Sequence, residues 1–438
     1  MASSVAKQLL LSNEIDVVFC FSPSVNVATS FKATLETVLK CRLDGLLGAY
    51  GQVLTYQSML NLGESFWSLL ASHRSLIIFD EIHHCAGDHL GNANAWGQKI
   101  IQHIQGKATY TMALTGTPWR SDRIPIALSS YCQQGTVHCD YRYGLDQAIK
   151  DRVCRIPKIT AIDNENISVK TGDKVEKYKS FGGLLKHSKC SYQQLLDNTT
   201  LINYLVKSSV EKLNSIRKTN KNAAGLIVAA SVEHALKTAD LLHKISGEKP
   251  LIATYIHDDS QEIIQQFRDS NAKWIISVGM ISEGTDIPRL RVCCHLTRVK
   301  TELYFRQVLG RILRAQKSAI EKAYLFMPAE PSLIEYAERV AEDVPESNTI
   351  SLNLMNYTPT LEPIASPLDE SISDSNESFE LSISDGMDSV TPSIISTSNT
   401  EETSEAFTFS TLSEAYEATV DLFGRFKKRM ISVSLLNV

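Results

Sequence analysis

The sequence has no excess of basic residues, no paired-cysteine metal motif and no long hydrophobic run. Its 44 lysines and arginines are outnumbered by 49 aspartates and glutamates, so the formal net charge is −5. A globally basic surface for nucleic acid is therefore excluded, and any such site must be a local groove. None of the nine cysteines forms a C-x-x-C pair, which argues against a zinc ribbon. No apolar stretch reaches the roughly 20 residues that span a bilayer, so we expect no membrane partner.

The start of the chain also lacks a targeting pattern. The first residues, MASSVAKQLLLSNEIDVVF, contain neither the apolar core nor the cleavage site of a secretory signal peptide. An odd number of cysteines without such a leader fits a reducing compartment, and we expect a cytoplasmic protein. The hydrophobic fraction of 43% and charged fraction of 21% are typical of a soluble globular protein.

Short apolar strands alternate with helical segments in two blocks. The predicted strands span residues 16–21, 53–56, 76–79, 110–114, 226–230, 254–255, 274–278, 292–296 and 323–326. Such alternation is typical of parallel sheets that are covered on both faces by helices. We therefore predict an α/β fold with two parallel-sheet domains, residues 1–150 and 221–345, joined by a linker or helical connection over residues 151–220.

The composition changes after residue 345. Residues 346–410 are rich in Ser, Thr, Asp and Glu and contain few large apolar residues, as in DESISDSNESFELSISDGMDS. Such a segment cannot bury enough surface to offset the entropy of ordering, so we predict a disordered acidic tail. Residues 411–438 regain helical spacing. We predict an amphipathic helix there, which either docks on a protein partner or folds back on the body.

The stretch LIIFDEIHHCAGD, residues 76–88, is an apolar strand that ends in two acids. In parallel α/β sheets, ligands lie beyond the carboxyl ends of the strands. At that edge Asp80 can hold Mg²⁺, and Glu81 can take a proton from an attacking water. The pattern therefore suits phosphate hydrolysis, although an acid pair after a strand is also commonly a solvated turn.

A zinc site is a further interpretation of the same stretch. Its candidate ligands are His83, His84, Cys85 and Asp88. Adjacent residues of one short loop cannot all approach one metal with tetrahedral geometry, so the pattern disfavours zinc.

Two further loops carry polar residues. ALTGTPWRSD follows a predicted strand, and its Thr115, Gly116 and Thr117 can hydrogen-bond the acids of a neighbouring strand. The alternative is a plain turn. SVGMISEGTDIPRLRV contains Gly284, which permits close backbone approach to a ligand, and Asp286, which can accept a hydrogen bond from a ribose hydroxyl.

The fragment YFRQVLGRILR, residues 304–314, predicts a basic helix face. Arg311 and Arg314 lie three residues apart, and Gln307 lies a turn earlier. Two guanidinium groups and an amide on one face can clamp a phosphate, although a basic helix face is more often simply solvated.

Taken together and in this order, the four fragments resemble the motifs of superfamily 2 helicases. The resemblance is to the DEAD/DEAH-box group related to type III restriction enzyme Res subunits, and it covers residues 1 to about 345. It implies two RecA-like domains in tandem with ATP and Mg²⁺ between them. It also implies that ATP hydrolysis is coupled to movement on nucleic acid, with DNA favoured over RNA.

The resemblance assigns roles to the first-domain residues. Asp80 would engage Mg²⁺ through water, Glu81 would be the catalytic base and His83 would couple the domains at the nucleotide. Thr115, Gly116 and Thr117 would link hydrolysis to strand movement. The residues that would grip the sugar–phosphate backbone are Ser22, Pro23, Thr55, Tyr56 and Gln57.

In the second domain, the resemblance matches Gly284 and Asp286 to the nucleotide-contacting loop called motif V. Gln307, Arg311 and Arg314 match motif VI, whose arginines would reach the γ-phosphate.

One part that the resemblance implies is missing from the sequence. The phosphate-binding pattern G-x-x-x-x-G-K-[ST] does not occur in the 438 residues. The resemblance places that loop just before ASSVAKQLLL, so we expect an N-terminally truncated chain that binds and hydrolyses ATP poorly, with Met1 internal to a longer reading frame. The alternatives are a non-catalytic nucleic-acid-binding subunit and a decayed gene product.

Overall fold

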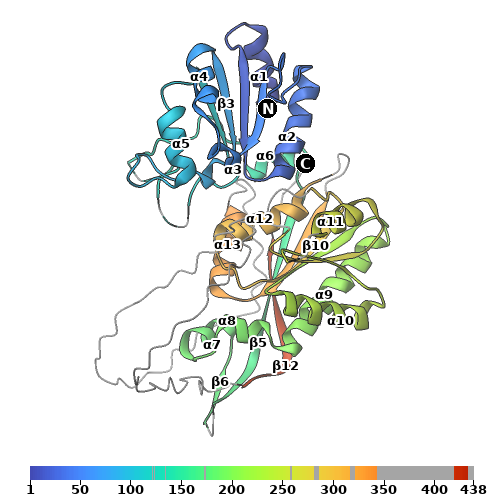
Figure 1. The fold of residues 1–438 in the computed structure, drawn as a ribbon. Helices are drawn as coiled ribbons and strands as arrows, with labels where there is room; N and C mark the ends of the chain where they lie inside the picture. The colour runs from blue at the N-terminus through green and yellow to red at the C-terminus, as the bar shows by residue number, and fades with distance from the viewer. Residues whose placement is uncertain are drawn as a thin grey trace, which may run out of the picture. The chain divides into compact units, whose positions relative to one another are not determined.

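The structure of the chain is a computed structural model. It describes residues 1–120, 122, 124–133, 135–171, 174–256, 259–280, 286–315, 321–342 and 419–432. The tail predicted at residues 346–410 lies outside the described residues. The described strands form two β-sheets, each with its own covering helices (Figure 1).

The first sheet has four parallel strands in the order β2–β1–β3–β4. These strands are β1 (Val17–Ser22), β2 (Gly51–Thr55), β3 (Ser75–Asp80) and β4 (Tyr110–Leu114). Its helices are α1 (Ala2–Leu11), α2 (Val25–Leu39), α3 (Tyr56–Met59), α4 (Glu64–Ser72), α5 (Ala95–His103) and the 3₁₀ turn η1 (Ile82–His84). Because all four strands run the same way, their carboxyl ends share one edge.

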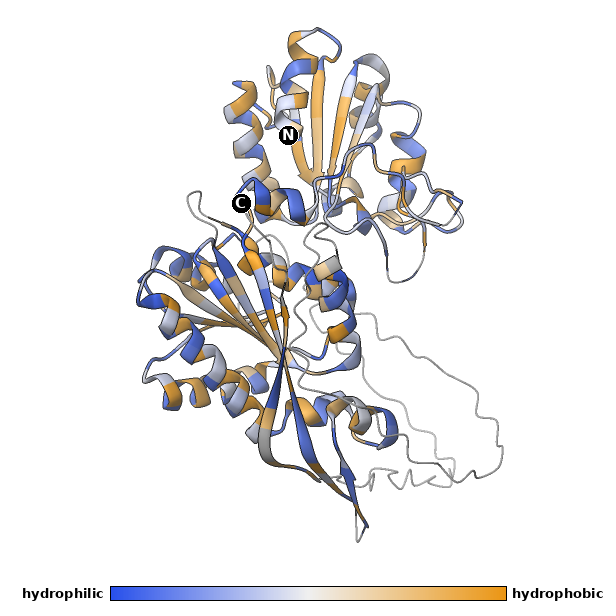
Figure 2. Ribbon diagram, turned by 180° about the vertical axis from the view of Figure 1, so that it is seen from behind, coloured by the Kyte–Doolittle hydropathy of each residue, from blue (hydrophilic) through white to orange (hydrophobic). Residues whose placement is uncertain are grey.

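Side-chain alternation along the strands separates two apolar clusters. Phe21 and Phe79 pack on one face, and their rings are stacked 5.9 Å apart. Cys20 and Ile78 point into the cluster on the other face. Figure 2 shows the strands of this sheet as largely hydrophobic. A strand buried on both faces lies inside a covered parallel sheet, as the sequence predicts.

The second sheet follows the order β12–β5–β11–β10–β7–β9–β8, and β6 pairs with β5. These strands are β5 (Ile156–Thr171), β6 (Lys174–Tyr178), β7 (Ala224–Ala229), β8 (Leu251–Thr254), β9 (Trp274–Val278), β10 (Leu290–Leu296), β11 (Lys322–Pro328) and β12 (Thr419–Ser432). The helices are α6 (Leu145–Lys150), α7 (Phe181–His187), α8 (Tyr192–Leu196), α9 (Thr199–Arg217), α10 (Val232–Ser246), α11 (Ser260–Asp269), α12 (Glu302–Leu313) and α13 (Pro331–Glu342). The fold-class prediction of two α/β parallel-sheet domains in tandem is confirmed.

The interpretation of residues 151–220 as a connection is wrong. Strand β5 lies within that range and pairs in parallel with β11, while α9 contributes buried side chains to the core of the sheet. The polar residues around Asn164–Asn166 interrupt the apolar pattern, so the sequence does not indicate a strand there. These residues lie where β5 pairs with β12. Asn166 is exposed, and the buried Asn164 side chain accepts a hydrogen bond from the Asn166 amide at 2.7 Å, so polar residues are accommodated there.

The helix predicted over residues 411–438 is also wrong, because residues 419–432 form β12. This strand runs antiparallel to β5, with Val420 opposite Val169 and Ile431 opposite Ile159. A register shift between Phe423 and Phe426 interrupts the two-residue alternation. The interruption gives the apolar residues a spacing that imitates a helix.

Within the described residues, every helix falls short of the length and hydrophobicity that a membrane crossing requires.

His295 is a buried titratable group at the end of β10. Its side chain is fully buried, and neither ring nitrogen has a hydrogen-bond partner in another described residue. Burial lowers the pKa of His295 to about 4, because the charged ring loses its hydration. The unfolded chain therefore binds a proton between that value and about 6.5, where the folded chain does not.

We predict that the free energy of unfolding falls as the pH is lowered from 7 to 5. The contribution of His295 to this fall is about 2 kcal/mol, with full stability retained above its unfolded pKa. Urea unfolding followed by the fluorescence of the buried Trp274 measures it. In His295→Leu the difference between the two pH values should shrink by that amount. An unchanged difference would contradict the assignment.

Candidate active site

The two acids of the first sheet lie at its carboxyl edge. Asp80 is the last residue of β3, and Glu81 follows it with φ 53° and ψ 52°, in the left-handed region. This conformation costs a residue with a Cβ atom about 1–2 kcal/mol. The Tyr56 hydroxyl helps to fix it by donating a hydrogen bond of 2.8 Å to the Asp80 carbonyl. Strain of this kind concentrates at functional sites.

A hydrogen-bond relay joins Glu81 to the loop after β4. The Thr115 hydroxyl donates to Glu81 Oε2 at 3.3 Å, and His83 Nδ1 lies 2.9 Å from the same hydroxyl oxygen. The Thr117 amide donates to that oxygen at 3.0 Å. Because the hydroxyl donates its one hydrogen to Glu81, it accepts a hydrogen bond from His83. Nδ1 of His83 therefore carries a proton. The relay thus connects both predicted loops.

Hydrogen bonds hold His83 at both its side chain and its backbone carbonyl. Its side chain is buried, and its Nε2 atom has no hydrogen-bond partner among the described residues. Arg120 donates to the His83 carbonyl at 2.5 Å and forms an ion pair with Asp122. Sequence reasoning missed Arg120, although it lies in the fragment that supplied Thr115.

The structure corrects part of the predicted nucleic-acid contact. The side chains of Ser22 and Tyr56 are fully buried, so neither can contact a nucleic-acid strand in this conformation. Thr55 caps α3 by accepting a hydrogen bond from the Ser58 amide at 3.2 Å. Gln57 is exposed. Pro23, the remaining candidate, is half-buried.

The second sheet brings two predicted residues together. Arg314 and Asp286 form an ion pair of 2.5 Å, and both side chains are nearly half exposed. Helix α12 ends at Leu313, and Arg314 follows it with an extended backbone. The prediction that Arg311 and Arg314 share a helix face is therefore wrong, since only Arg311 is helical. Gln307 lies on α12, whereas Gly284 lies outside the described residues.

A buried arginine fixes the position of this ion pair. The guanidinium group of Arg155 donates to the carbonyls of Pro288, Leu290 and Ile312 at 2.8–3.1 Å. It also donates to Glu321 Oε2 at 2.7 Å. One side chain therefore ties together the end of α12, the start of β10 and the chain before β11. Sequence reasoning missed Arg155, because it lies in the segment interpreted as a connection and belongs to no motif.

The donor atoms at the first edge fit a magnesium ion better than zinc. Asp80, Glu81 and Thr115 offer oxygen atoms, which Mg²⁺ prefers. Cys85 is buried, and burial raises the pKa of its thiol, which opposes zinc binding. Asp88 pairs with His89 at 2.7 Å. The described part of the chain contains no cluster of three or more His, Cys, Asp or Glu residues with metal-binding geometry.

Comparison with known proteins gives a match in the second domain. Residues 207–316 match the family described as the helicase conserved C-terminal domain. An uncharacterized protein of Mycobacterium leprae is 31% identical over 274 residues, which are 61% of this chain and 45% of that protein. The DNA 3'-5' translocase XPB2 of Sulfurisphaera tokodaii is 24% identical over 318 residues, covering 67% of this chain and 68% of the translocase.

Among solved structures, S. cerevisiae Dbp5 bound to RNA and ADP BeF3 superposes with a TM-score of 0.44 and 14% identity. The superposition covers 79% of this chain and 81% of Dbp5. The chain spans about half the length of the mycobacterial relatives that it matches.

We predict that Thr115→Val destabilises the first domain by about 1–2 kcal/mol, because Glu81 and His83 lose a shared partner. Thr111→Val on β4, the strand that precedes Thr115, is the control, since Thr111 is exposed. Chemical unfolding of both variants measures the difference. Equal effects would show that the relay contributes nothing to stability.

We predict that Arg155→Met lowers the free energy of unfolding of the second domain by about 3–5 kcal/mol, since buried carbonyls and Glu321 lose their donor. Arg339→Met removes the two ion pairs of an exposed arginine, with Glu302 and Glu335, and should cost much less than Arg155→Met. Tryptophan fluorescence, to which the buried Trp274 of the second domain contributes, reports both transitions. A loss below that of Arg339→Met would refute the role of Arg155.

The two sheets, the acids at the end of β3 and the family match over residues 207–316 are mutually consistent. At the level of its second domain, the chain is similar to helicases.

Proposed function

We propose that the chain is the core of an ATP-dependent DNA helicase or translocase of superfamily 2, in the DEAD/DEAH-box group related to type III restriction enzyme Res subunits. The observation that carries the proposal is the relay from Glu81 through Thr115 to His83. It joins a strained strand-end acid to the neighbouring loop. Such a connection lets the loop respond to the state of the acid. The helicase C-terminal domain match supports the same proposal.

Each site residue has a chemical task in this proposal. Mg²⁺, when bound through Asp80, neutralises phosphate charge. Glu81 orients a water and accepts its proton, while its hydrogen bond from Thr115 fixes the carboxylate. Arg314 and Arg311 stabilise charge on the transferred phosphoryl group.

The ion pair between Arg314 and Asp286 gives the arginine a resting position. A triphosphate competes with Asp286 for the guanidinium group, because both offer anionic oxygens. Binding of nucleotide then favours the conformation in which Arg314 leaves Asp286. This exchange ties the presence of the γ-phosphate to the loop before β10.

DNA is the nucleic acid along which the protein moves in this proposal. The relative from Sulfurisphaera tokodaii is named a DNA translocase, and the sequence motifs favour the same branch. A protein partner bound through the segment beyond residue 345 and a cytoplasmic location also belong to the proposal.

A second candidate function is a non-catalytic nucleic-acid-binding subunit. It is favoured by one observation, the lack of G-x-x-x-x-G-K-[ST] among the 438 residues. In that case another polypeptide supplies the phosphate-binding loop or no hydrolysis occurs. Sequencing upstream of Met1 distinguishes the two, because a strand followed by this loop restores the enzyme.

The proposal predicts mutant rates for a form of the protein that includes the phosphate-binding loop. Glu81→Gln should abolish DNA-stimulated ATP hydrolysis and spare ATP binding. Arg314→Ala should lower turnover by about 10³–10⁵-fold. Phosphate release measures turnover, and Glu64→Gln on the exposed start of α4 is the control. Wild-type rates in both site variants would mean that the roles are misassigned.

A further inference from the structure

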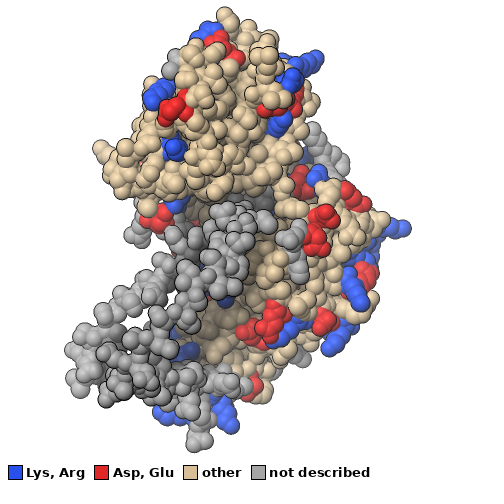
Figure 3. All heavy atoms as spheres, viewed as in Figure 1, with Lys and Arg blue, Asp and Glu red and all other residues tan. Residues whose placement is uncertain are grey.

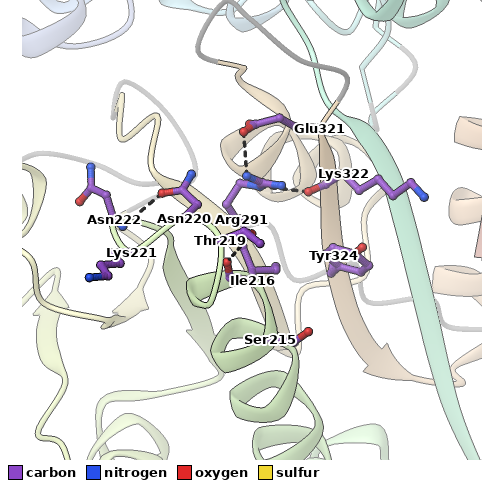
Figure 4. Close-up of a pocket in the computed structure, with 10 residues that line it drawn as sticks. All are labelled: Ser215, Ile216, Thr219, Asn220, Lys221, Asn222, Arg291, Glu321, Lys322 and Tyr324. Atoms are coloured by element: carbon purple, nitrogen blue, oxygen red, sulfur yellow. Dashed lines mark hydrogen bonds and ion pairs between the residues drawn. The ribbon is translucent and has the colours of Figure 1, made fainter.

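A polar cavity lies beside the amino ends of β10 and β11. Its volume is about 840 Å³. One side is the turn that follows α9, with Thr219, Asn220 and Lys221, and the other side carries Lys322 and Tyr324 (Figure 4). Hydroxyl, amide and ammonium groups therefore surround the space. These groups are the usual donors to phosphate and sugar oxygens.

The cavity keeps an excess of positive charge. Its one acidic residue, Glu321, is bound by two guanidinium groups, from Arg155 at 2.7 Å and from Arg291 at 2.9 Å. Those two arginines together outweigh the single charge of Glu321. Among the ion pairs of the described residues, none involves Lys322. An anion can therefore approach Lys322 without displacing a carboxylate.

The positive surface continues from the cavity across the sheet. Lys158 of β5 lies opposite Tyr324 of β11, and Lys322 lies two residues before Tyr324, so all three share one face. Lys212 of α9 places its Nζ atom 4.6 Å from the centre of the Tyr324 ring. Burial and the charge of Lys322 lower the pKa of Lys158. A bound anion would relieve this repulsion.

The same face extends onto β12. Lys428 pairs in register with Ile162, four residues along β5 from Lys158, and so points to the same side. Its Nζ atom lies 5.3 Å from the centre of the Tyr204 ring. Phe426 stacks on that ring at 4.4 Å. Lysines and aromatic rings from β11, β5, β12 and α9 thus lie on one face of the sheet.

We propose that this lysine–tyrosine surface binds a single strand of nucleic acid through its phosphates, with the Tyr324 ring, which lines the cavity, as a stacking platform for a base. The surface consists of Lys158, Lys212, Lys322, Lys428, Tyr204 and Tyr324. It includes neither Asp286 nor Arg314, and binding there requires no ATP hydrolysis. The inference therefore does not depend on the proposed motor function.

Charge alone would also fit an acidic protein segment, but the rings favour nucleic acid. A base stacked on an aromatic side chain contributes about 1–3 kcal/mol, and an acidic peptide has no equivalent group. On the face of the molecule seen in Figure 3, acidic and basic side chains are interspersed. On the β11–β5–β12 face and on α9, two of the lysines lie over the two tyrosine rings.

The test measures binding of a fluorescein-labelled single-stranded DNA of about 20 nucleotides by anisotropy, without ATP. Salt is varied between about 50 and 200 mM. Each phosphate contact on a single strand contributes about 0.7 to the slope of log K against log salt. Lys158→Gln/Lys322→Gln should therefore reduce the slope by about 1.4 and weaken binding on the order of tenfold.

The matched control is Lys244→Gln/Lys249→Gln, which removes the same charge from exposed positions at the end of α10 and just after it. Its slope should stay at the wild-type value. Tyr324→Leu should weaken binding with no change in slope, since it removes the ring that lines the cavity and no charge. An equal loss in the control pair, or no binding by the wild-type chain, would overturn the proposal.

A competitor distinguishes nucleic acid from acidic protein. Polyglutamate of the same total charge should displace the DNA poorly. Displacement as efficient as by unlabelled DNA would assign the surface to an acidic peptide and refute nucleic-acid binding. ATP turnover plays no part in either outcome, so failure here is distinguishable from failure of the motor proposal.

Discussion

A buried guanidinium group needs acceptors for its N–H donors, and this need constrains the second domain. Four hydrogen bonds from Arg155 go to three backbone carbonyls and one carboxylate drawn from three separate parts of the chain. Removing the charge from water is costly, so these acceptors cannot drift apart independently. The end of α12 and the loop before β10 therefore hold fixed positions. The ion pair of Arg314 with Asp286 depends on both of them.

In the first domain, hydrogen bonds converge on a neutral group, the Thr115 hydroxyl. It donates a hydrogen bond to Glu81 and accepts hydrogen bonds from His83 and the Thr117 amide. A change in charge at the acid must alter that set of hydrogen bonds. His83 and Thr117 are buried, so this network has few arrangements, because an unsatisfied buried member is costly. The arrangement gives a physical basis for communication between two adjacent strands.

The sequence predicted the strands that form short apolar runs and missed those that carry polar residues or an irregular register. Strands β3 and β9 are continuous apolar runs, and their positions follow from composition alone. Strand β5 carries Asp163 and Asn164 in its middle, and β12 has an irregular register, so neither shows a clean period. These two strands pair over a long sequence separation, which no local pattern records.

The candidate residues divide in a similar way. Asp80, Glu81 and Thr115 were predictable, because strand ends at one sheet edge must lie together. Tyr56 was predicted to contact nucleic acid but is buried, since an aromatic ring suits a core as well as a ligand. Arg314 was assigned to a helix that ends one residue earlier. Cap geometry depends on tertiary contacts such as that of Cys154 with Arg314, which local spacing does not encode.

Strand β12 makes the second domain discontinuous in sequence. It covers the edge of β5, a strand of 16 residues that would otherwise present unpaired amides and carbonyls over that length. A protease cut between α13 and β12 would leave the closing strand held by non-covalent contacts alone. Its loss would uncover that edge and invite strand exchange between neighbouring molecules, so an intact connection before β12 also protects the domain from self-association.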